Sequence, residues 1–464
     1  MKVALVYKIT AKNSTSRHGI IIITPFFDHT SGRNHGGMVF VYLCPIYRLR
    51  MRFLLKQMPF LLWVLALPAQ VLTEVAPPPN IRSVVFKGLT EDQFPIVQLG
   101  EPMTLEFDDL TAREDDYYYR LVHCNYDWTP SALLKSQYLS GMDNQRIVDY
   151  SNSYSTLQPY SNYRLRIPNG QVAPRVSGNY VLEIYDAGGA LQFSRRFVVY
   201  QDLAQVAAVV RRSRQFESMN VKQSVQFSIR PVGIQLINPK KEVKVAILQN
   251  YHWPTARFNI APQFTLGNEL VYKYDEETAF YGGNEYLYFD TSDLRAPTAA
   301  ISRIELTDLY NHYLFRNVFR YDQVYTYYPD INGDFVIRTL QGRDPSRESE
   351  YTRVHFRLPY TDLIGLDRVY IFGKFNNYAL QDENLMTFNP DTGDMEANLL
   401  FKQGFYNFKY VIEREDGTVE LNTVCGNFHV TENIYTILVY YRNFGDIYDS
   451  VIGVGSVNSE TITN

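Results

Sequence analysis

Apolar and polar residues alternate with a period of two along most of the chain, and this pattern constrains the fold more than any other feature of the sequence. The alternation is clearest at residues 103–108, 163–167, 225–230 and 353–358. It places one row of side chains on a core and the other in water, as in antiparallel sheets. The 37 tyrosines and 28 phenylalanines suit this arrangement, because aromatic side chains fit a pleated surface. The sequence therefore predicts an all-β fold.

Turn signals separate the predicted strands at short intervals. Ala187-Gly188-Gly189 lies between the apolar segments 180–185 and 191–200, and Asp416-Gly417 follows the segment 406–412. Each of these pairs of features predicts a β-hairpin. Many short strands joined by such turns are typical of β-sandwiches. We therefore expect tandem immunoglobulin-like β-sandwiches, about three in number.

The length of 464 residues allows roughly two to four domains, and three sandwich-sized blocks fit the strand pattern. We expect the first β-sandwich over residues 71–200, the second over 201–328 and the third over 329–442. Residues 443–464 are rich in Gly, Ser, Asn and Thr, which predicts a flexible tail. A core in each block excludes a chain that is disordered throughout.

The N-terminal residues have the composition of a targeting segment. Arg52 and Lys56 precede a ten-residue apolar run at 58–67, and Ala69 offers a small residue for cleavage. This pattern predicts a secretory signal peptide over residues 51–69, too short to span a bilayer comfortably. Because a signal peptide acts at the true N-terminus, residues 1–50 are interpreted as a mis-annotated leader. A genuine disordered leader is the alternative.

Charge is unevenly distributed between this segment and the rest of the chain. Residues 1–69 hold nine Lys or Arg residues and one acid, Asp28, so the remaining chain has 36 basic and 48 acidic residues and a formal charge of −12. An acidic protein is a poor ligand for phosphates, which argues against a nucleic-acid partner. No cysteine follows the apolar run, so a lipid anchor is not expected. The mature chain is predicted to be exported and acidic.

Chemistry-bearing motifs are absent from the sequence. The five histidines after residue 69 are scattered singly, with no metal-ligand spacing, and no phosphate-binding or nucleophile motif occurs. The acidic turns at 330–334 and 389–394 do not complete a calcium loop, and Asp or Asn before Gly is ordinary turn chemistry. We therefore expect no catalytic residues, no metal and no cofactor.

Two cysteines lie after the predicted signal peptide, Cys124 and Cys425, about 300 residues apart. They fall in different predicted sandwiches, so a disulfide between them would require the two sandwiches to pack closely. Two buried thiols are the other possibility, since free cysteine is commonly buried. The sequence leaves both states open.

Aromatic residues cluster in the segment 117–130, which reads YYYRLVHCNYDWTP. Similar clusters occur at 251–254 and 325–329. Buried core and edge positions of sandwiches are one explanation for these clusters. A surface for a protein partner is a second explanation, because tyrosine and tryptophan dominate interface hot spots. Stacking on sugar rings is a third.

The segment 369–412 resembles early-set immunoglobulin-like modules of the kind that bind glycogen or precede the catalytic domain of branching enzymes. VYIFGKFNNY at 369–378 and GFYNFKYVI at 404–412 carry this resemblance. It implies an early-set sandwich for the third block. Those modules favour tryptophan where Tyr378 stands, and the third block contains no tryptophan. We therefore expect the sandwich without the sugar ligand.

Over nearly its whole mature length the chain resembles the plug proteins of the type IX secretion system of Bacteroidetes. The resemblance is carried by short motifs in a fixed order: LGEP at 99–102, YYY at 117–119, HCNYDW at 123–128, DNQR at 143–146, GNY at 178–180, QNY at 249–251, YKYD at 272–275, GGNEY at 282–286, PDING at 329–333, YRN at 441–443 and VIG at 451–453. Residues 1–50 lie outside it, which agrees with a mis-set start.

The resemblance implies a periplasmic, non-enzymatic protein that docks on the periplasmic mouth of the large outer-membrane translocon barrel and seals it. A mixture of Tyr, Trp and polar groups suits an interface, so we expect His123, Tyr126, Asp127 and Trp128 to contribute to the docking surface. The alternative function is a periplasmic glycan-binding β-sandwich protein. Exposed, coplanar aromatic rings on the third sandwich would favour that alternative.

Overall fold

The computed structural model describes residues 7–8, 24–25, 70–90 and 92–462, and the chain forms two units, Met1–Pro68 and Ala69–Asn464. In the first unit, β1 (Tyr7–Lys8) pairs with β2 (Thr24–Pro25) in antiparallel fashion. Apart from these two short strands, the predicted leader at 1–50 and the predicted signal peptide at 51–69 lie outside the described residues.

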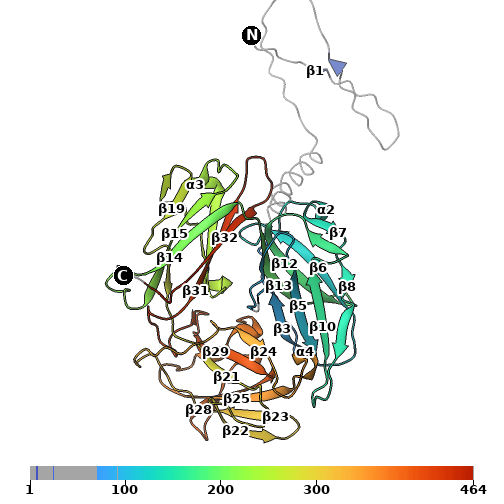
Figure 1. Ribbon diagram of the computed structural model, residues 1–464, viewed down its shortest axis with the longest axis vertical. Coiled ribbons are helices and arrows are strands. Elements are labelled where there is room, and N and C mark those ends of the chain that lie inside the picture. Colours follow the sequence, from blue (N-terminus) through green and yellow to red (C-terminus); the bar gives the residue numbers. More distant parts are fainter. Residues whose placement is uncertain (1–6, 9–23, 26–69, 91, 463–464) are drawn as a thin grey trace, which may run out of the picture. The chain divides into compact units, whose positions relative to one another are not determined.

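The regular secondary structure of the unit Ala69–Asn464 is almost entirely strand, which confirms the predicted all-β fold with β-sandwich domains. Its strands gather into three lobes (Figure 1). The first lobe comprises the strands within residues 81–200. The second lobe comprises residues 204–281 together with 434–458, and the third comprises residues 287–420.

Two main sheets build the first lobe. One has the strand order β3-β5-β10-β9 and the other β4-β13-β12-β6-β8, while β11 and β7 form a separate pair. The strand bounds are β3 Ile81–Lys87, β4 Ile96–Gln98, β5 Met103–Asp109, β6 Tyr117–Cys124, β7 Leu139–Gly141, β8 Gln145–Arg146, β9 Asp149–Asn152, β10 Ser161–Ile167, β11 Val172–Pro174, β12 Gly178–Asp186 and β13 Leu191–Tyr200. The predicted alternation holds: Leu105, Phe107 and Tyr163 are buried, and Arg164 and Arg166 are exposed.

The second lobe also has two sheets, ordered β14-β15-β19-β18, with β20 beside β15, and β17-β16-β31-β32. The bounds are β14 Ala204–Arg212, β15 Lys222–Pro231, β16 Val243–Gln249, β17 Arg257–Phe258, β18 Phe264–Leu266, β19 Glu269–Tyr272, β20 Ala279–Tyr281, β31 Ile434–Tyr441 and β32 Ser450–Asn458. Val225, Phe227 and Ile229 on β15 face a core shared with Ile437 and Val439 on β31.

In the third lobe, β22-β23-β25-β28-β27 form one sheet, and β21-β29-β24 form the other, with β26 and β30 also paired to β29. The bounds are β21 Leu287–Asp290, β22 Ile301–Leu306, β23 Tyr310–Leu314, β24 Phe335–Ile337, β25 Tyr351–Pro359, β26 Arg368–Phe372, β27 Thr387–Asn389, β28 Asp394–Lys402, β29 Gly404–Glu413 and β30 Val419–Glu420. Phe289, Phe356 and Phe401 meet at the centre of its core.

Helices are few and short in the described unit. They are α2 Lys135–Tyr138, α3 Pro239–Glu242, α4 Pro345–Glu348, η1 Trp253–Thr255, η2 Lys374–Asn376 and η3 Asp382–Asn384. No helix among the described residues has the length and apolar character needed to cross a membrane. Both predicted hairpins are confirmed: β12 pairs with β13 across Gly188-Gly189, and β29 pairs with β30 across Asp416-Gly417.

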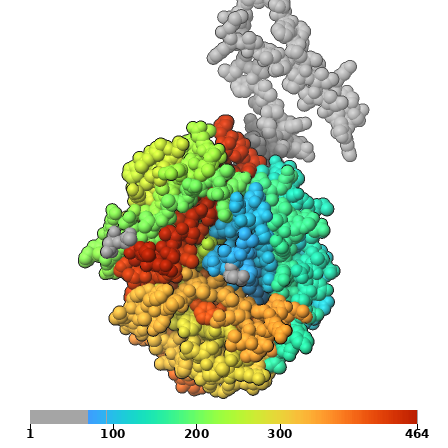
Figure 2. Space-filling model, in the orientation of Figure 1, coloured from blue at the N-terminus to red at the C-terminus, as the bar shows by residue number. Residues whose placement is uncertain are grey.

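The path of the chain differs from the expected order of blocks. Strands β21 to β23, expected in the second sandwich at 201–328, pair with strands of the third lobe. Strand β31, expected to close the third sandwich at 329–442, pairs instead with β16 of the second lobe. The expected flexible tail at 443–464 contains β32, a strand of nine residues that pairs with β31. Figure 2 shows these C-terminal residues, in red, against the green second lobe.

The chain therefore leaves the second lobe, builds the third and returns to complete the second. The returning segment contacts the outgoing one where they cross, with Phe428 N donating to Gly283 O at 2.7 Å. It also contacts the loop before β15, with His429 N donating to Asn220 O at 2.9 Å. Gly282 is required at this crossing, because a Cβ atom there would lie 2.1 Å from the Phe428 carbonyl oxygen. The alternation of apolar and polar residues within a strand does not show which distant strand it pairs with, so this path could not be predicted from that pattern.

Candidate interaction surface

The residues expected at the docking surface lie mostly inside the molecule. His123 and Trp128 are buried, Tyr126 is half-buried, and Asp127 is exposed. The expectation that all four side chains face a partner is thus corrected for His123 and Trp128. Their burial follows from the position of the segment, which ends β6 at the contact between the first and second lobes.

His123 is a neutral core residue of the first lobe. Its Nδ1 lies 2.8 Å from Ser131 Oγ, its Nε2 lies 3.3 Å from Ser177 O, and its ring packs edge-on against Tyr180. Burial lowers the pKa of His123 to about 4, because the charged imidazolium would lose its hydration. The side chain therefore supports packing.

Trp128 joins the first lobe to the second. Its ring packs edge-on against Trp253 at a centroid distance of 4.7 Å, and the Arg196 guanidinium carbon lies 4.4 Å above it. Leu248 and Tyr440 of the second lobe belong to the same buried cluster. A tryptophan enclosed in this way contributes through burial and ring contacts.

Tyr126 and Asp127 also serve local structure. The Tyr126 hydroxyl donates to Asn259 Oδ1 at 2.8 Å, and Lys244 Nζ lies 3.9 Å from the centre of the tyrosine ring. Asp127 Oδ1 accepts hydrogen bonds from the backbone N (3.1 Å) and the hydroxyl (2.6 Å) of Thr129, as in an Asx turn. Only Asp127 of the four residues is open to a partner.

A buried ion pair ties the first lobe to the third. Lys402 Nζ on β28 lies 2.7 Å from Asp108 Oδ2 on β5, and the two side chains are 2% and 0% exposed. The Tyr351 hydroxyl donates to the same carboxylate oxygen at 2.7 Å, and Asn162 Nδ2 donates to Asp108 Oδ1 at 2.8 Å. This fully bonded network fixes the relative placement of the two lobes.

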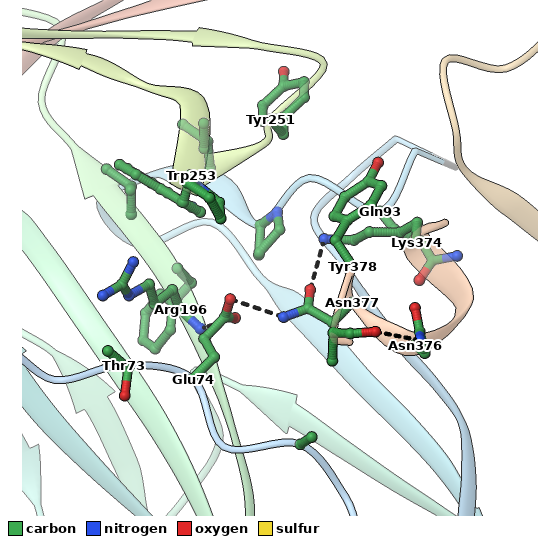
Figure 3. A pocket seen from close by; sticks show the side chains of 17 residues that line it. Thr73, Glu74, Gln93, Arg196, Tyr251, Trp253, Lys374, Asn376, Asn377 and Tyr378 are labelled. Carbon is green, nitrogen blue, oxygen red and sulfur yellow. Dashed lines mark hydrogen bonds between the residues drawn. The ribbon is translucent and has the colours of Figure 1, made fainter. Parts of the chain in front are cut away.

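All three lobes line a central cavity of about 260 Å³ (Figure 3). Glu74 bridges its walls: one carboxylate oxygen accepts from Arg196 N at 2.8 Å and the other from Asn377 Nδ2 at 2.8 Å. Lys374 Nζ reaches Asn377 Oδ1 at 3.3 Å, and burial lowers the pKa of this ammonium. Because Glu74 and Lys374 both bond to the Asn377 amide, the cavity acts as a polar junction between the lobes.

Tyr378, at the position where the early-set modules favour tryptophan, lines this cavity. Its ring packs edge-on against His252 of the second lobe at 4.9 Å and lies 5.0 Å from Phe372. On the open part of the third lobe, the Tyr360 and Phe388 rings are inclined at 58° to each other. Neither arrangement gives the exposed, coplanar rings that would favour the glycan-binding alternative.

Asp334 at the junction of the first and third lobes carries a testable pH dependence. Its Oδ2 accepts from Gln93 N at 3.0 Å, and burial raises the pKa of the carboxyl to about 6, against a partial lowering by that hydrogen bond and by Lys374. The folded chain then holds a proton between pH 4 and 6 that the unfolded chain has lost, so the free energy of unfolding falls as pH rises through this range.

Between pH 4 and pH 7, the parent chain should lose about 2–3 kcal/mol of unfolding free energy relative to the Asp334→Asn variant, which cannot titrate at this position. Urea denaturation at several pH values measures it. The test depends on how this stability difference changes with pH. Its value at any single pH also includes the altered hydrogen bond from Gln93 N to residue 334. A difference that does not change with pH would contradict the assignment.

The segment 315–328, which follows β23, has no strand or helix and is rich in exposed apolar side chains. Six of its large apolar side chains are exposed: Phe315, Val318, Tyr321, Val324, Tyr327 and Tyr328. Val324 is 90% exposed. Long stretches without regular structure in a compact domain are usually functional, and concentrated apolar exposure marks interaction sites.

Polar contacts hold the backbone of the 315–328 segment in place. Three of them are Arg316 Nε to Asp394 Oδ1 (2.8 Å), Arg320 N to Val424 O (2.8 Å) and the Tyr325 hydroxyl to Glu285 Oε1 (2.5 Å). Since these anchors point into the third lobe, the apolar side chains between them point outward. The segment is preorganised, so a partner would spend little free energy on ordering it.

One signal for this segment is present in the sequence. The aromatic cluster at 325–329 is similar in composition to the cluster at 117–130, and the sequence alone favours the latter for the interface. The structure separates the two: the cluster at 117–130 packs inside, whereas Tyr327 and Tyr328 are exposed. Exposure depends on strand pairing, which composition alone does not reveal.

We next consider the residues that could form a metal site or react chemically. Among the described residues, no group of three or more His, Cys, Asp or Glu side chains could hold a metal ion. The expected turn at 330–334 is present, with Asp330 Oδ1 accepting from Asn332 N at 2.6 Å. Cys124 and Cys425 are both buried free thiols. Burial raises the pKa of Cys124 to about 12, so this thiol stays protonated.

A sequence profile described as the first domain of the type 9 secretion system plug protein matches residues 81–201, which form the first lobe. The chain belongs to the type IX secretion system plug protein family. No protein with a curated description matches this plug-family chain.

The plug-family chain is also similar to a solved structure. The crystal structure of a hypothetical protein from Parabacteroides merdae ATCC 43184, at 2.30 Å resolution, matches it with a TM-score of 0.80 and 30% sequence identity. The match covers 84% of this chain and 100% of that chain. The likeness therefore extends well beyond the first lobe, which the family profile matches.

Proposed function

We propose that the protein is a non-enzymatic periplasmic plug that docks on the periplasmic opening of the outer-membrane type IX translocon and seals it. Membership of the plug family supports a role in type IX secretion. The observation that carries the docking step is the anchored, exposed 315–328 segment, which offers a preorganised apolar surface to a large protein partner.

The contacts between the lobes support the sealing step. A seal must keep its shape against a pore, and here buried polar contacts link each lobe to another: Asp108 to Lys402, and Tyr440 to Asn179 at 2.9 Å. These contacts join the first lobe to the third and the second, so the three lobes resist relative movement. A plug must also leave the pore during secretion, which fits a standard-sized interface better than an obligate one.

We further propose that the plug reaches the periplasm through the signal peptide at 51–69 and carries no lipid anchor. The three lobes correspond, in this proposal, to three β-sandwich domains, the second of which is interrupted by the third. No charged surface for nucleic acid is invoked, because the chain after residue 69 is acidic.

A tagged mature chain should recover a very large outer-membrane barrel from solubilised envelopes, identified by mass spectrometry. We expect the Val324→Asp variant to recover at least about tenfold less of it, because a charge placed in an apolar interface must lose its hydration without a partner. The parent and variant should unfold at the same temperature, since Val324 is 90% exposed.

Phe216→Asp is the matched control, because Phe216 is 89% exposed and lies on the second lobe, outside the 315–328 segment. It should recover as much barrel as the parent chain. Equal recovery by Val324→Asp and the parent would refute docking through this segment, while recovery of no barrel by the parent would refute the plug itself. Sealing is measured separately as the fall in ion conductance when the plug is added to the barrel in a planar bilayer.

A further inference from the structure

A second, larger cavity of about 630 Å³ lies at the junction of the second and third lobes, where the outgoing and returning segments cross. Lys409 of β29 and Tyr286 form part of its wall. Gly283, Asn422 and Asn427, which belong to the two crossing segments, line it as well. This cavity is distinct from the central one and from the 315–328 segment.

Lys409 is buried in this wall, with only 8% of the residue exposed. Its ammonium lies 4.0 Å from the centre of the Tyr286 ring, a cation–π contact. Among the described residues, no hydrogen-bond acceptor and no carboxylate lies within bonding distance of Lys409 Nζ. A buried ammonium without an anion is costly, and proteins rarely keep one unless something else supplies the anion.

Among the described residues, no charged side chain forms an ion pair with Lys409. Glu285 and Asp330 lie nearby but beyond ion-pair distance, and their oxygens accept from other donors, the Tyr325 hydroxyl and the backbone N of Tyr286 and Asn332. Glu420, on the cavity wall, is paired with Arg414. Arg320 adds a further positive charge from the neighbouring segment. In the described part of the chain, Lys409 therefore has no carboxylate in direct contact, although Glu285 and Asp330 lie in its surroundings.

Asn422 stands close to the ammonium, and Asn427 lies on the same cavity wall. A Cβ atom at Gly283 would lie 3.2 Å from Asn422 Oδ1 and 3.4 Å from Lys409 Nζ, which places both groups beside this glycine. Gly283 N donates to Asn427 Oδ1 at 2.8 Å, which leaves the Asn427 amide NH₂ directed away from that bond. An ammonium beside amide side chains, whose NH₂ groups can turn toward an anion, suits the two oxygens of a carboxylate.

We propose that this cavity binds a small carboxylate-bearing ligand, with Lys409 as the counter-charge and Asn422 and Asn427 as hydrogen-bond donors to the carboxylate. Phe280, Phe372 and His252 also line the cavity and offer aromatic faces to the rest of the molecule. Aromatic walls combined with amides suit a ring that bears hydroxyl groups, so a sugar acid is the class of ligand that the lining fits.

The test uses glucuronate as the probe and glucose as its uncharged counterpart, with the full mature chain. Glucuronate should bind in calorimetric titration and raise the unfolding temperature, whereas glucose should do neither. The Lys409→Met variant should bind glucuronate at least tenfold more weakly, and Asn422→Ala about tenfold more weakly, because each removes a donor to a charged group. Lys241→Met, at a lysine side chain that is 78% exposed on the second lobe, should bind like the parent.

A second measurement on the unaltered chain does not depend on any variant folding. The acetylation rate of Lys409 by N-hydroxysuccinimide acetate is followed by mass spectrometry, and glucuronate should slow it while glucose should not. Two results would each overturn the proposal. One is a parent chain that neither binds glucuronate nor gains protection of Lys409; the other is a folded Lys409→Met variant that retains the parent's affinity.

Discussion

Replacement of Lys402 by methionine should lower the free energy of unfolding by about 3–5 kcal/mol, as measured by guanidinium denaturation. Lys402 Nζ lies 2.7 Å from Asp108 Oδ2 and 2.8 Å from Ser346 O, and it also sits 4.1 Å from the Tyr160 ring centre. Methionine preserves most of the volume but removes the charge. Asp108, fully buried, would then be left with only the neutral donors Tyr351 and Asn162.

Two further variants make this prediction specific. Glu305→Gln is the control, because it breaks a solvent-exposed ion pair between Glu305 and Arg303. It should lower the free energy of unfolding by no more than about 1 kcal/mol. Combining Lys402→Met with Asp108→Asn should recover part of the loss, since no unpaired charge remains. A loss below about 1 kcal/mol for Lys402→Met alone would show that the ion pair does not hold the first and third lobes together.

The ion pair illustrates how the first and third lobes are joined. Asp108 and Lys402 are 294 positions apart, and each lies on a strand whose other buried residues serve its own lobe. Tyr351, beside Lys402 in the β25–β28 pair, adds its hydroxyl to the same carboxylate. A polar network buried between two sandwich cores fixes their orientation, because any rotation would leave its members unbonded.

The secondary structure can be predicted from the sequence because its cause is local. Alternation at 103–108 and 225–230 marks strands whose faces differ in polarity, and the glycines at 188–189 and 417 mark their hairpins. Each signal depends on residues within a few positions of one another. The all-β fold and its turns therefore follow from the amino-acid sequence alone.

The arrangement of the lobes cannot be predicted in the same way. Strand β31 pairs with β16 over a separation of nearly 200 residues, and nothing in the composition of 434–441 distinguishes that partner from a strand of the third lobe. The small polar residues of the segment 443–464 predict a flexible tail. Yet Val451 and Ile452 are buried, and Gly453 and Gly455 allow β32 to lie close against Ala204 and Val206.

The same limit explains why the sequence does not show which aromatic cluster is exposed. Tyr and Trp are enriched both at interfaces and in sandwich cores, so their frequency does not separate exposed from buried positions. Trp128 is 2% exposed and Tyr328 is 54% exposed, although both stand in aromatic, polar-flanked segments. The difference arises from the second lobe, which covers Trp128 and leaves the 315–328 segment open.

Replacement of Trp128 by alanine should destabilise the protein by about 3–5 kcal/mol, a loss of the size found for large buried aromatic side chains. The change empties a site bounded by Trp253, Leu248 and Tyr440 of the second lobe, and the Arg196 guanidinium loses its cation–π partner. Denaturation monitored by the fluorescence of Trp253, the only other tryptophan after residue 69, measures both the stability and the opening of this contact.

A graded series distinguishes packing from docking at this position. Trp128→Phe should cost less than half as much as Trp128→Ala, because the ring is retained and the indole Nε1 has no hydrogen-bond partner among the described residues. Asp127→Ala, at the exposed neighbour, should cost no more than about 1 kcal/mol, the value of the turn bonds to Thr129. A different result would contradict this: Trp128→Ala could keep the parent's stability and fail only to recover the outer-membrane barrel. The 123–128 segment would then be a docking surface, and the contact that encloses Trp128 between the lobes would have to open when the plug binds.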